Sequence, residues 1–138
     1  MLTRLWTAGI KVSNLDKELE FHRRLGNEIV LDEYIQLGGE SFRLPLVKMG
    51  DKYIHLMETT VYERQLGESL PYGICHLVYV TSSFDEDVAK ALSAGAKQIG
   101  ETAVLKAGFG ERKLAFFRAP GGWNFEIIEI IRNFVPEV

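Results

Sequence analysis

Two histidines and one glutamate lie at matching places in a sequence that repeats, and side chains of these types can bind a metal ion. His55 lies in residues 50–58, and Glu126 lies in residues 121–129. Each segment begins with a glycine-containing turn and continues with alternating apolar residues, which predicts a β-strand. A shift of 71 positions (126 − 55) aligns the segments and places His55 on Glu126. We therefore expect the two side chains at equivalent points of two related halves.

A second shift, of 69 positions (76 − 7), places Thr7 on His76. It also aligns the predicted helix caps and helix ends of the two halves, Asn14 with Ser83 and Gly26 with Gly95. Because a strand fixes the face on which alternate side chains lie, the first and last strands of each half should present equivalent positions on one face. The four positions are Thr7, His55, His76 and Glu126.

Three of these four residues are good metal ligands, whereas Thr7 is a poor one. Two neutral imidazoles and one carboxylate form a recurrent shell for Zn²⁺, Fe²⁺, Ni²⁺, Co²⁺ or Mn²⁺ and leave positions open for water or substrate. The competing interpretation is that the histidines are ordinary strand residues and that Glu126 is solvated. The chain has three histidines, and two of them occupy equivalent positions beside a carboxylate, which favours the metal site.

Other reactive residues fit structural roles better. His22 falls within the first predicted helix, and Cys75 should point to the sheet face opposite its neighbour, where a buried thiol is expected. Glu58 is a weak candidate for proton transfer, because strand alternation directs it away from His55. Residues 107–110 suit either a lid or a hairpin turn. Three scattered arginines are candidates for holding an anionic substrate: Arg43, Arg112 and Arg118.

Composition limits the classes of protein and ligand. The length of 138 residues suits one domain, and the apolar fraction of 46% with a charged fraction of 25% is that of a globular protein. No apolar run is long enough for a membrane span. A net charge of −3 without a basic cluster argues against nucleic acid and favours a small-molecule partner. One cysteine and no signal-peptide pattern predict a cytoplasmic protein.

The strand and helix patterns predict an α+β fold of two βαβββ modules. Module 1 covers about residues 1–60, a connector covers about 61–72, and module 2 covers about 73–134. Capped amphipathic helices are expected at 14–26 and 83–95. The expected strands are 2–13, 28–37, 41–48 and 50–58 in module 1, and 74–81, 97–105, 113–118 and 121–129 in module 2.

Three segments resemble the vicinal oxygen chelate superfamily, which includes glyoxalases, bleomycin-resistance proteins and extradiol dioxygenases. They are residues 12–26 (VSNLDKELEFHRRLG), 73–80 (GICHLVYV) and 117–126 (FRAPGGWNFE). The resemblance implies that both modules form a single cup-shaped mixed sheet, which holds a divalent metal through one residue from each of four strands. It implies metal ligation by His55, His76 and Glu126, with Thr7 where a histidine is expected and His22 where a tyrosine is common.

The expected function is that of a divalent-metal-dependent enzyme, of isomerase, lyase or dioxygenase type, acting on a small substrate that chelates through oxygen. The alternative is a metal-free protein that binds an antibiotic or another small molecule in a cup lined partly by aromatic residues, Trp6 among them. Family members of this length commonly form homodimers, so a homodimer is also expected. The residues expected to contact substrate are Thr7, Tyr53, Phe109, Trp123 and Arg118.

Overall fold

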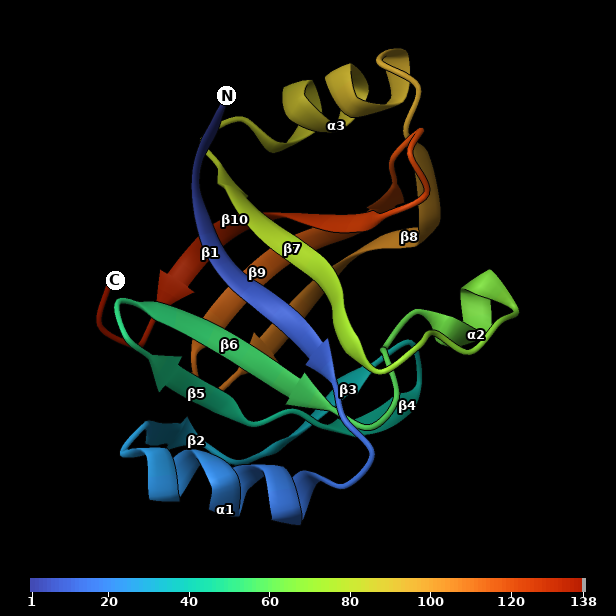
Figure 1. The fold of residues 1–138 in the computed structure, drawn as a ribbon. Coiled ribbons are helices and arrows are strands. Elements are labelled where there is room, and N and C mark those ends of the chain that lie inside the picture. Colours follow the sequence, from blue (N-terminus) through green and yellow to red (C-terminus); the bar gives the residue numbers. More distant parts are fainter. Residues whose placement is uncertain (138) are drawn as a thin grey trace.

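The structure, a computed structural model, describes residues 1–137. A strongly curved eight-stranded sheet forms the body of this part of the chain (Figure 1). The elements in chain order are β1 (Leu2–Lys11), α1 (Leu15–Leu25), β2 (Glu28–Leu31), β3 (Tyr34–Leu37), β4 (Glu40–Arg43), β5 (Leu46–Met49), β6 (Lys52–Met57), α2 (Glu63–Leu66), β7 (Gly73–Thr81), α3 (Phe84–Ser93), β8 (Lys97–Ala107), β9 (Gly110–Arg118) and β10 (Asn124–Asn133). None of the helices in residues 1–137 has the length and apolar character needed to cross a membrane.

The strand order β2-β5-β6-β1-β7-β10-β9-β8 confirms the predicted fold class. The first four strands of this order come from the first half of the chain and the last four from the second half. β1 and β7 pair antiparallel at the centre and join the halves, while β6 and β10 run parallel to β1 and β7 respectively. In this register Gly9 is opposite both His55 and His76, and Val78 is opposite both Thr7 and Glu126. The two shifts found in the sequence therefore describe a real pseudo-twofold relation.

Helices α1 and α3 cover the convex face of the sheet and leave its concave face for the site. Leu15 and Leu19 of α1 pack against Ile54 and Leu56 of β6, and Phe84 of α3 packs in the matching cluster with Ile127 of β10. α1 begins where the Asn14 side chain accepts a hydrogen bond from the Lys17 amide, and it ends at Gly26, whose φ is 87°. Because strand side chains alternate, the neighbours of these apolar residues point into the concave side.

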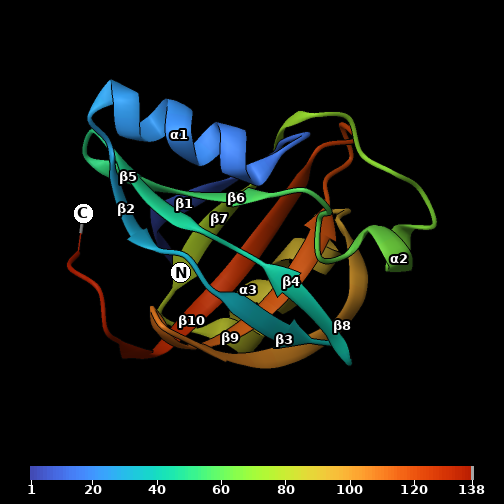
Figure 2. The ribbon, with the colours of Figure 1, turned by 90° about the horizontal axis from the view of Figure 1, so that it is seen from below.

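The predicted strands 28–37 and 41–48 are each broken into two, which is a difference from the sequence prediction. β2 and β5 stay in the main sheet, whereas β3 and β4 form a separate hairpin that turns at Gly38 and Gly39. Pro45 has no amide hydrogen to donate to a ladder at the break in the second run. At the break in the first run, Asp32 accepts hydrogen bonds from Arg43 of β4 through both carboxylate oxygens, each at 2.9 Å. The hairpin lies against β8 and partly covers the concave side (Figure 2).

Residues 107–110 form a tight hairpin turn between β8 and β9, which settles the choice left open by the sequence. The Gly108 amide donates to both carboxylate oxygens of Glu33, at 2.8 and 3.0 Å. A Cβ atom at Gly108 would lie 2.7 Å from Glu33 Oε2, so glycine permits this close approach. Phe109 is buried beneath the turn. The turn therefore joins the two ends of the curved sheet instead of standing free as a lid.

Candidate functional site

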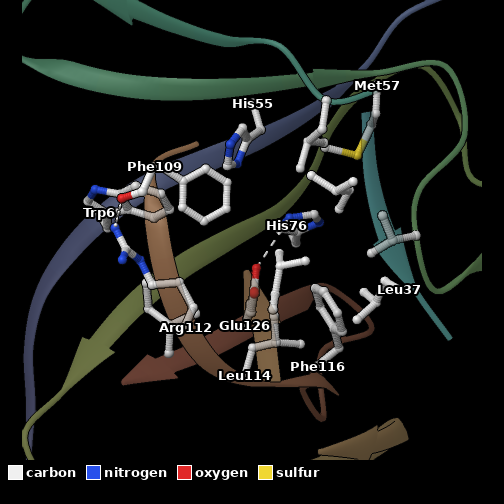
Figure 3. A pocket seen from close by; sticks show the side chains of 15 residues that line it. Trp6, Leu37, His55, Met57, His76, Phe109, Arg112, Leu114, Phe116 and Glu126 are labelled. Atoms are coloured by element: carbon white, nitrogen blue, oxygen red, sulfur yellow. Dashed lines mark hydrogen bonds and ion pairs between the residues drawn. The ribbon is translucent and has the colours of Figure 1, made fainter. Parts of the chain in front are cut away.

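The concave side of the sheet encloses a small cavity lined by His55 of β6, His76 of β7 and Glu126 of β10 (Figure 3). All three side chains are buried. The space open to the centre of a water molecule is about 30 Å³. One water needs about 10–15 Å³ on this measure, so the cavity accepts a group of two or three non-hydrogen atoms. The structure thus brings the three predicted metal ligands to the wall of one cavity.

Gly9 makes room for the imidazole of His76. Its strand, β1, lies between β6 and β7, and Gly9 faces His55 on one side and His76 on the other. A Cβ atom at this position would lie 2.5 Å from both Cε1 and Nε2 of His76, a distance that real atoms do not adopt. Glycine here therefore allows the ring to lie across β1 and to point its Nε2 into the cavity.

Tyr62, in the connector, contacts the Nδ1 side of the His76 ring. Its hydroxyl donates its single proton to the Cys75 carbonyl oxygen at 3.0 Å. The hydroxyl oxygen also lies 3.1 Å from His76 Nδ1, and both of its contacts are satisfied when it accepts from an Nδ1–H group. We therefore assign the His76 proton to Nδ1, which leaves the Nε2 lone pair free on the cavity side. Holding one imidazole nitrogen in this way is typical of histidines that ligate metals.

Two electron-pair donors face each other across the cavity. His76 Nε2 lies 3.8 Å from Glu126 Oε2. Burial lowers the pKa of His76 to about 4 and raises the pKa of Glu126 to about 8. The charge of Arg112 opposes the second shift by favouring the carboxylate. At neutral pH the imidazole is therefore uncharged and able to ligate a metal, and a cation at Glu126 must displace a proton.

His55 has a nitrogen that finds no partner in the protein. Its Nε2 is buried without a hydrogen bond, and its ring is enclosed by the rings of Trp6 and Phe109, with centroids 5.7 and 5.3 Å away. Burial, with smaller contributions from His76 and Arg112, lowers the pKa of His55 to about 3. The ring is therefore neutral, and a buried nitrogen without a partner costs stability unless a ligand satisfies it.

The chemistry of these donors fits a divalent metal, although the three side chains do not form a closed shell. Within residues 1–137 no group of three or more histidine, cysteine, aspartate or glutamate side chains is compact enough to hold a metal ion. His76 and Glu126 lie close to each other, so His55 is the residue that lies too far from the other two to complete a compact group. The unpartnered Nε2 of His55 and the free lone pair of His76 nevertheless provide two nitrogen donors, and Glu126 provides oxygen.

Of the predicted substrate contacts, Phe109 lines the cavity, whereas Thr7 and Tyr53 are buried beside it and bond to backbone. The Thr7 hydroxyl donates to the Ala8 carbonyl oxygen at 3.1 Å, and the Tyr53 hydroxyl donates to the Pro136 carbonyl oxygen at 2.7 Å. The structure therefore places Thr7 near the site with its hydroxyl already engaged.

Arg118 and Trp123 line a second groove beside the start of β7, and His76 also lines this groove. Arg118 bonds to Asn124 and pairs with Glu68, and Trp123 is half exposed. Glu58, the weak candidate for proton transfer, accepts a hydrogen bond at 2.8 Å from the amide of Leu15 at the start of α1. None of these three residues lines the cavity that His55 and Glu126 share, although His76 lines both that cavity and the groove.

Arg112 and Trp6 also line the cavity, although the sequence analysis named Arg112 only among three scattered arginines and Trp6 only for the metal-free alternative. Arg112, Leu114 and Phe116 are alternate residues of β9, and all three line the cavity. The alternation of side chains along a strand could therefore have predicted that Arg112 points into the cavity. Trp6 reaches the cavity where the pairing of β1 with β7 shifts register between Leu5 and Thr7. Regular alternation would have placed the indole on the opposite face.

Comparisons with solved structures give close matches in fold. A variant of Streptomyces coelicolor methylmalonyl-CoA epimerase in complex with 2-nitronate-propionyl-CoA matches 96% of this chain and 100% of its own at TM-score 0.72 and 22% identity. Methylmalonyl-CoA epimerase from Mycobacterium tuberculosis matches 95% and 90% at TM-score 0.71 and 25% identity. A variant of 4-hydroxymandelate synthase from Streptomyces coelicolor matches 99% and 50% at TM-score 0.65 and 14% identity. No protein-family model and no curated sequence matches the chain.

Proposed function

We propose that this chain, which has the vicinal oxygen chelate fold, is an enzyme that binds a divalent metal through His55, His76 and Glu126. The single observation that carries the proposal is the contact between His76 and Glu126. A nitrogen lone pair and a carboxyl oxygen face each other at 3.8 Å in a buried cavity, and the other nitrogen of His76 is held by Tyr62. Two acceptors in such a position are stabilised by a cation or a proton between them.

A divalent ion at these residues would polarise a substrate carbonyl and offset negative charge that develops on its oxygen. The protein contributes orientation and exclusion of water. Tyr62 holds the His76 ring, and Gly9 leaves space for it. Trp6 and Phe109 enclose the His55 side of the cavity, which keeps water out and strengthens electrostatic interactions inside.

The reaction type within this class is proposed as isomerase, lyase or dioxygenase chemistry on a small substrate that presents neighbouring oxygens. The fold shared with the epimerases and with the hydroxymandelate synthase supports a choice among several reaction types, because one architecture serves an epimerase and a synthase in those proteins. We also propose that the protein acts in the cytoplasm as a homodimer, on the composition and fold arguments given above.

The absence of a compact three-residue group within residues 1–137 favours a second candidate, a metal-free binding protein. The size of the cavity between His55 and Glu126 argues against such a ligand there, whereas the groove beside β7, which His76 also lines, has about 400 Å³. Pockets for drug-sized ligands are about 300–1,000 Å³, whereas this cavity provides about 30 Å³ for water centres. An antibiotic would require the walls to separate. A metal with one small chelating group fits the enclosed space better.

The test is metal stoichiometry in purified protein and in single variants. Elemental analysis after loading and desalting should give about one divalent ion per chain for the wild type. His76→Ala, Glu126→Gln and His55→Ala should each lower metal affinity by tenfold or more in competition with a chromogenic chelator. His22→Gln is the matched control, because His22 lies in α1, away from the cavity, and bonds to Asn27. Equal affinity in all five proteins would refute the metal site and leave the binding protein as the function.

A further inference from the structure

Arg112 places a positive charge inside the cavity wall. Its side chain is 1% exposed, and its guanidinium carbon lies 4.9 Å from the Trp6 ring and 5.1 Å from the Phe109 ring. Burial lowers the pKa of Arg112 to about 10, so the group remains charged at neutral pH. A fully buried guanidinium is normally paired with an acid, because an isolated buried charge is costly.

Within residues 1–137 the hydrogen bonds of Arg112 all go to neutral oxygens. Its two terminal nitrogens donate to the backbone carbonyls of Phe109, Glu111 and Arg132 and to the side-chain oxygen of Asn133. Its Nε is buried and has no hydrogen-bond partner. The terminal nitrogens thus anchor the group to the protein, and one donor and the net charge are left unsatisfied.

The unsatisfied donor of Arg112 and the unpartnered Nε2 of His55 belong to residues that line the same cavity. The charge of Arg112 lowers the pKa values of both His55 and Glu126, so it lies within electrostatic range of both. A metal held by Glu126 would add positive charge to a wall that already has an unpaired guanidinium. Both features call for an anion in the remaining space.

We propose that Arg112 is the recognition group for the carboxylate of a small substrate. A carboxylate accepts hydrogen bonds only, which matches the free Nε donor, and charge-assisted bonds of this kind are the strong ones. Its three atoms alone would fill the space that the cavity offers, so binding of a whole substrate requires the cavity walls to separate. The further assignment, that a neighbouring oxygen of the same substrate faces His55 and His76, rests on the proposed function. The substrate class is therefore a small 2-oxo or 2-hydroxy carboxylate.

The probes are pyruvate and pyruvamide, which have nearly the same shape and differ in charge. Calorimetric titration of chelator-treated and of metal-loaded protein should show that pyruvate binds at least about tenfold more tightly than pyruvamide, the factor expected of one charge-assisted hydrogen bond. Arg112→Gln should remove this preference to within about twofold. Arg24→Gln should keep it, because Arg24 is exposed on α1 and pairs with Glu20.

A measurement on the wild type avoids dependence on the folding of Arg112→Gln, which loses several backbone contacts. The proton and nitrogen resonances of arginine Nε–H groups can be followed by NMR, and pyruvate should shift that of Arg112 while the exposed Arg24 stays in place. Equal binding of the two probes, no binding at millimolar concentrations, or binding without a shift at Arg112 would each overturn the inference. A preference for pyruvate in a protein that takes up no metal would support it while refuting the metal site. Metal uptake without a preference for pyruvate would support the metal site and refute the inference about Arg112.

Discussion

Replacing Glu126 by glutamine should stabilise the metal-free protein at neutral pH, although Glu126 is a proposed ligand. Burial raises the pKa of Glu126 from 4.5 to about 8, so the folded protein binds this proton more tightly than the unfolded chain. A carboxyl group with a raised pKa loses stability as the pH rises from the unfolded pKa to the folded pKa. The window is therefore about pH 4.5 to about 8, and glutamine has no proton to lose in it.

The magnitude follows from about 1.4 kcal/mol for each pH unit inside the window. Between about pH 5.5 and about pH 7.5 the wild type should lose about 2–3 kcal/mol of unfolding free energy relative to Glu126→Gln. Urea unfolding with a chelator present, at both pH values, measures this difference. Using the change between two pH values cancels any packing difference between the two side chains. His55 and His76 titrate in both proteins, so their contributions to the pH-dependent change in unfolding free energy cancel approximately in the difference.

The matched control is Glu129→Gln on the same strand, where the side chain is partly exposed and water solvates it. Its unfolding free energy should follow that of the wild type at both pH values. A wild type and a Glu126→Gln variant that change in parallel with pH would refute the account of a buried, unpaired carboxyl group. With metal in excess the order should reverse, because binding stabilises only the protein that retains the ligand.

Three further outcomes are expected. Gly9→Ala should displace the His76 ring, lower the free energy of unfolding in urea by about 1–3 kcal/mol and weaken metal binding. Unchanged stability and metal affinity would mean that the ring does not depend on the space at Gly9. Tyr62→Phe should leave His76 Nδ1 with only the weak contact to Cys75 Sγ at 3.5 Å and lower metal affinity by about 10–100-fold in chelator competition. An unaltered affinity would refute the orienting role of Tyr62. Metal affinity should rise with pH up to about 8 as the Glu126 proton becomes easier to displace, and a flat profile would contradict ligation by this carboxyl group.

The repeat carried most of the information about the fold. The 69-residue shift relates Thr7 to His76 by sequence alone, and the observed register places Gly9 and Val78 between the related strands in the same way. The equivalent positions could be predicted from sequence because strand alternation and helix caps depend on residues close together in the chain. They located His76 on the concave face without any knowledge of the rest of the chain.

What the sequence did not predict depends on contacts between distant segments. The hairpin of β3 and β4 leaves the sheet near Arg43, which pairs with Asp16 and Asp32, residues that come together only in the folded chain. Tyr62 lies in a connector without periodicity, so its bond to His76 had no local signal. The register shift that turns Trp6 inward likewise depends on pairing across strands.

The most direct test of the central claim is a crystal structure of the metal-loaded protein with anomalous difference density recorded at the metal absorption edge. We expect one peak in the cavity, bonded by His55, His76 and the carboxylate of Glu126, with the His55 ring drawn toward the other two. A loaded crystal with its peak elsewhere, or with no peak between His76 and Glu126, would contradict it.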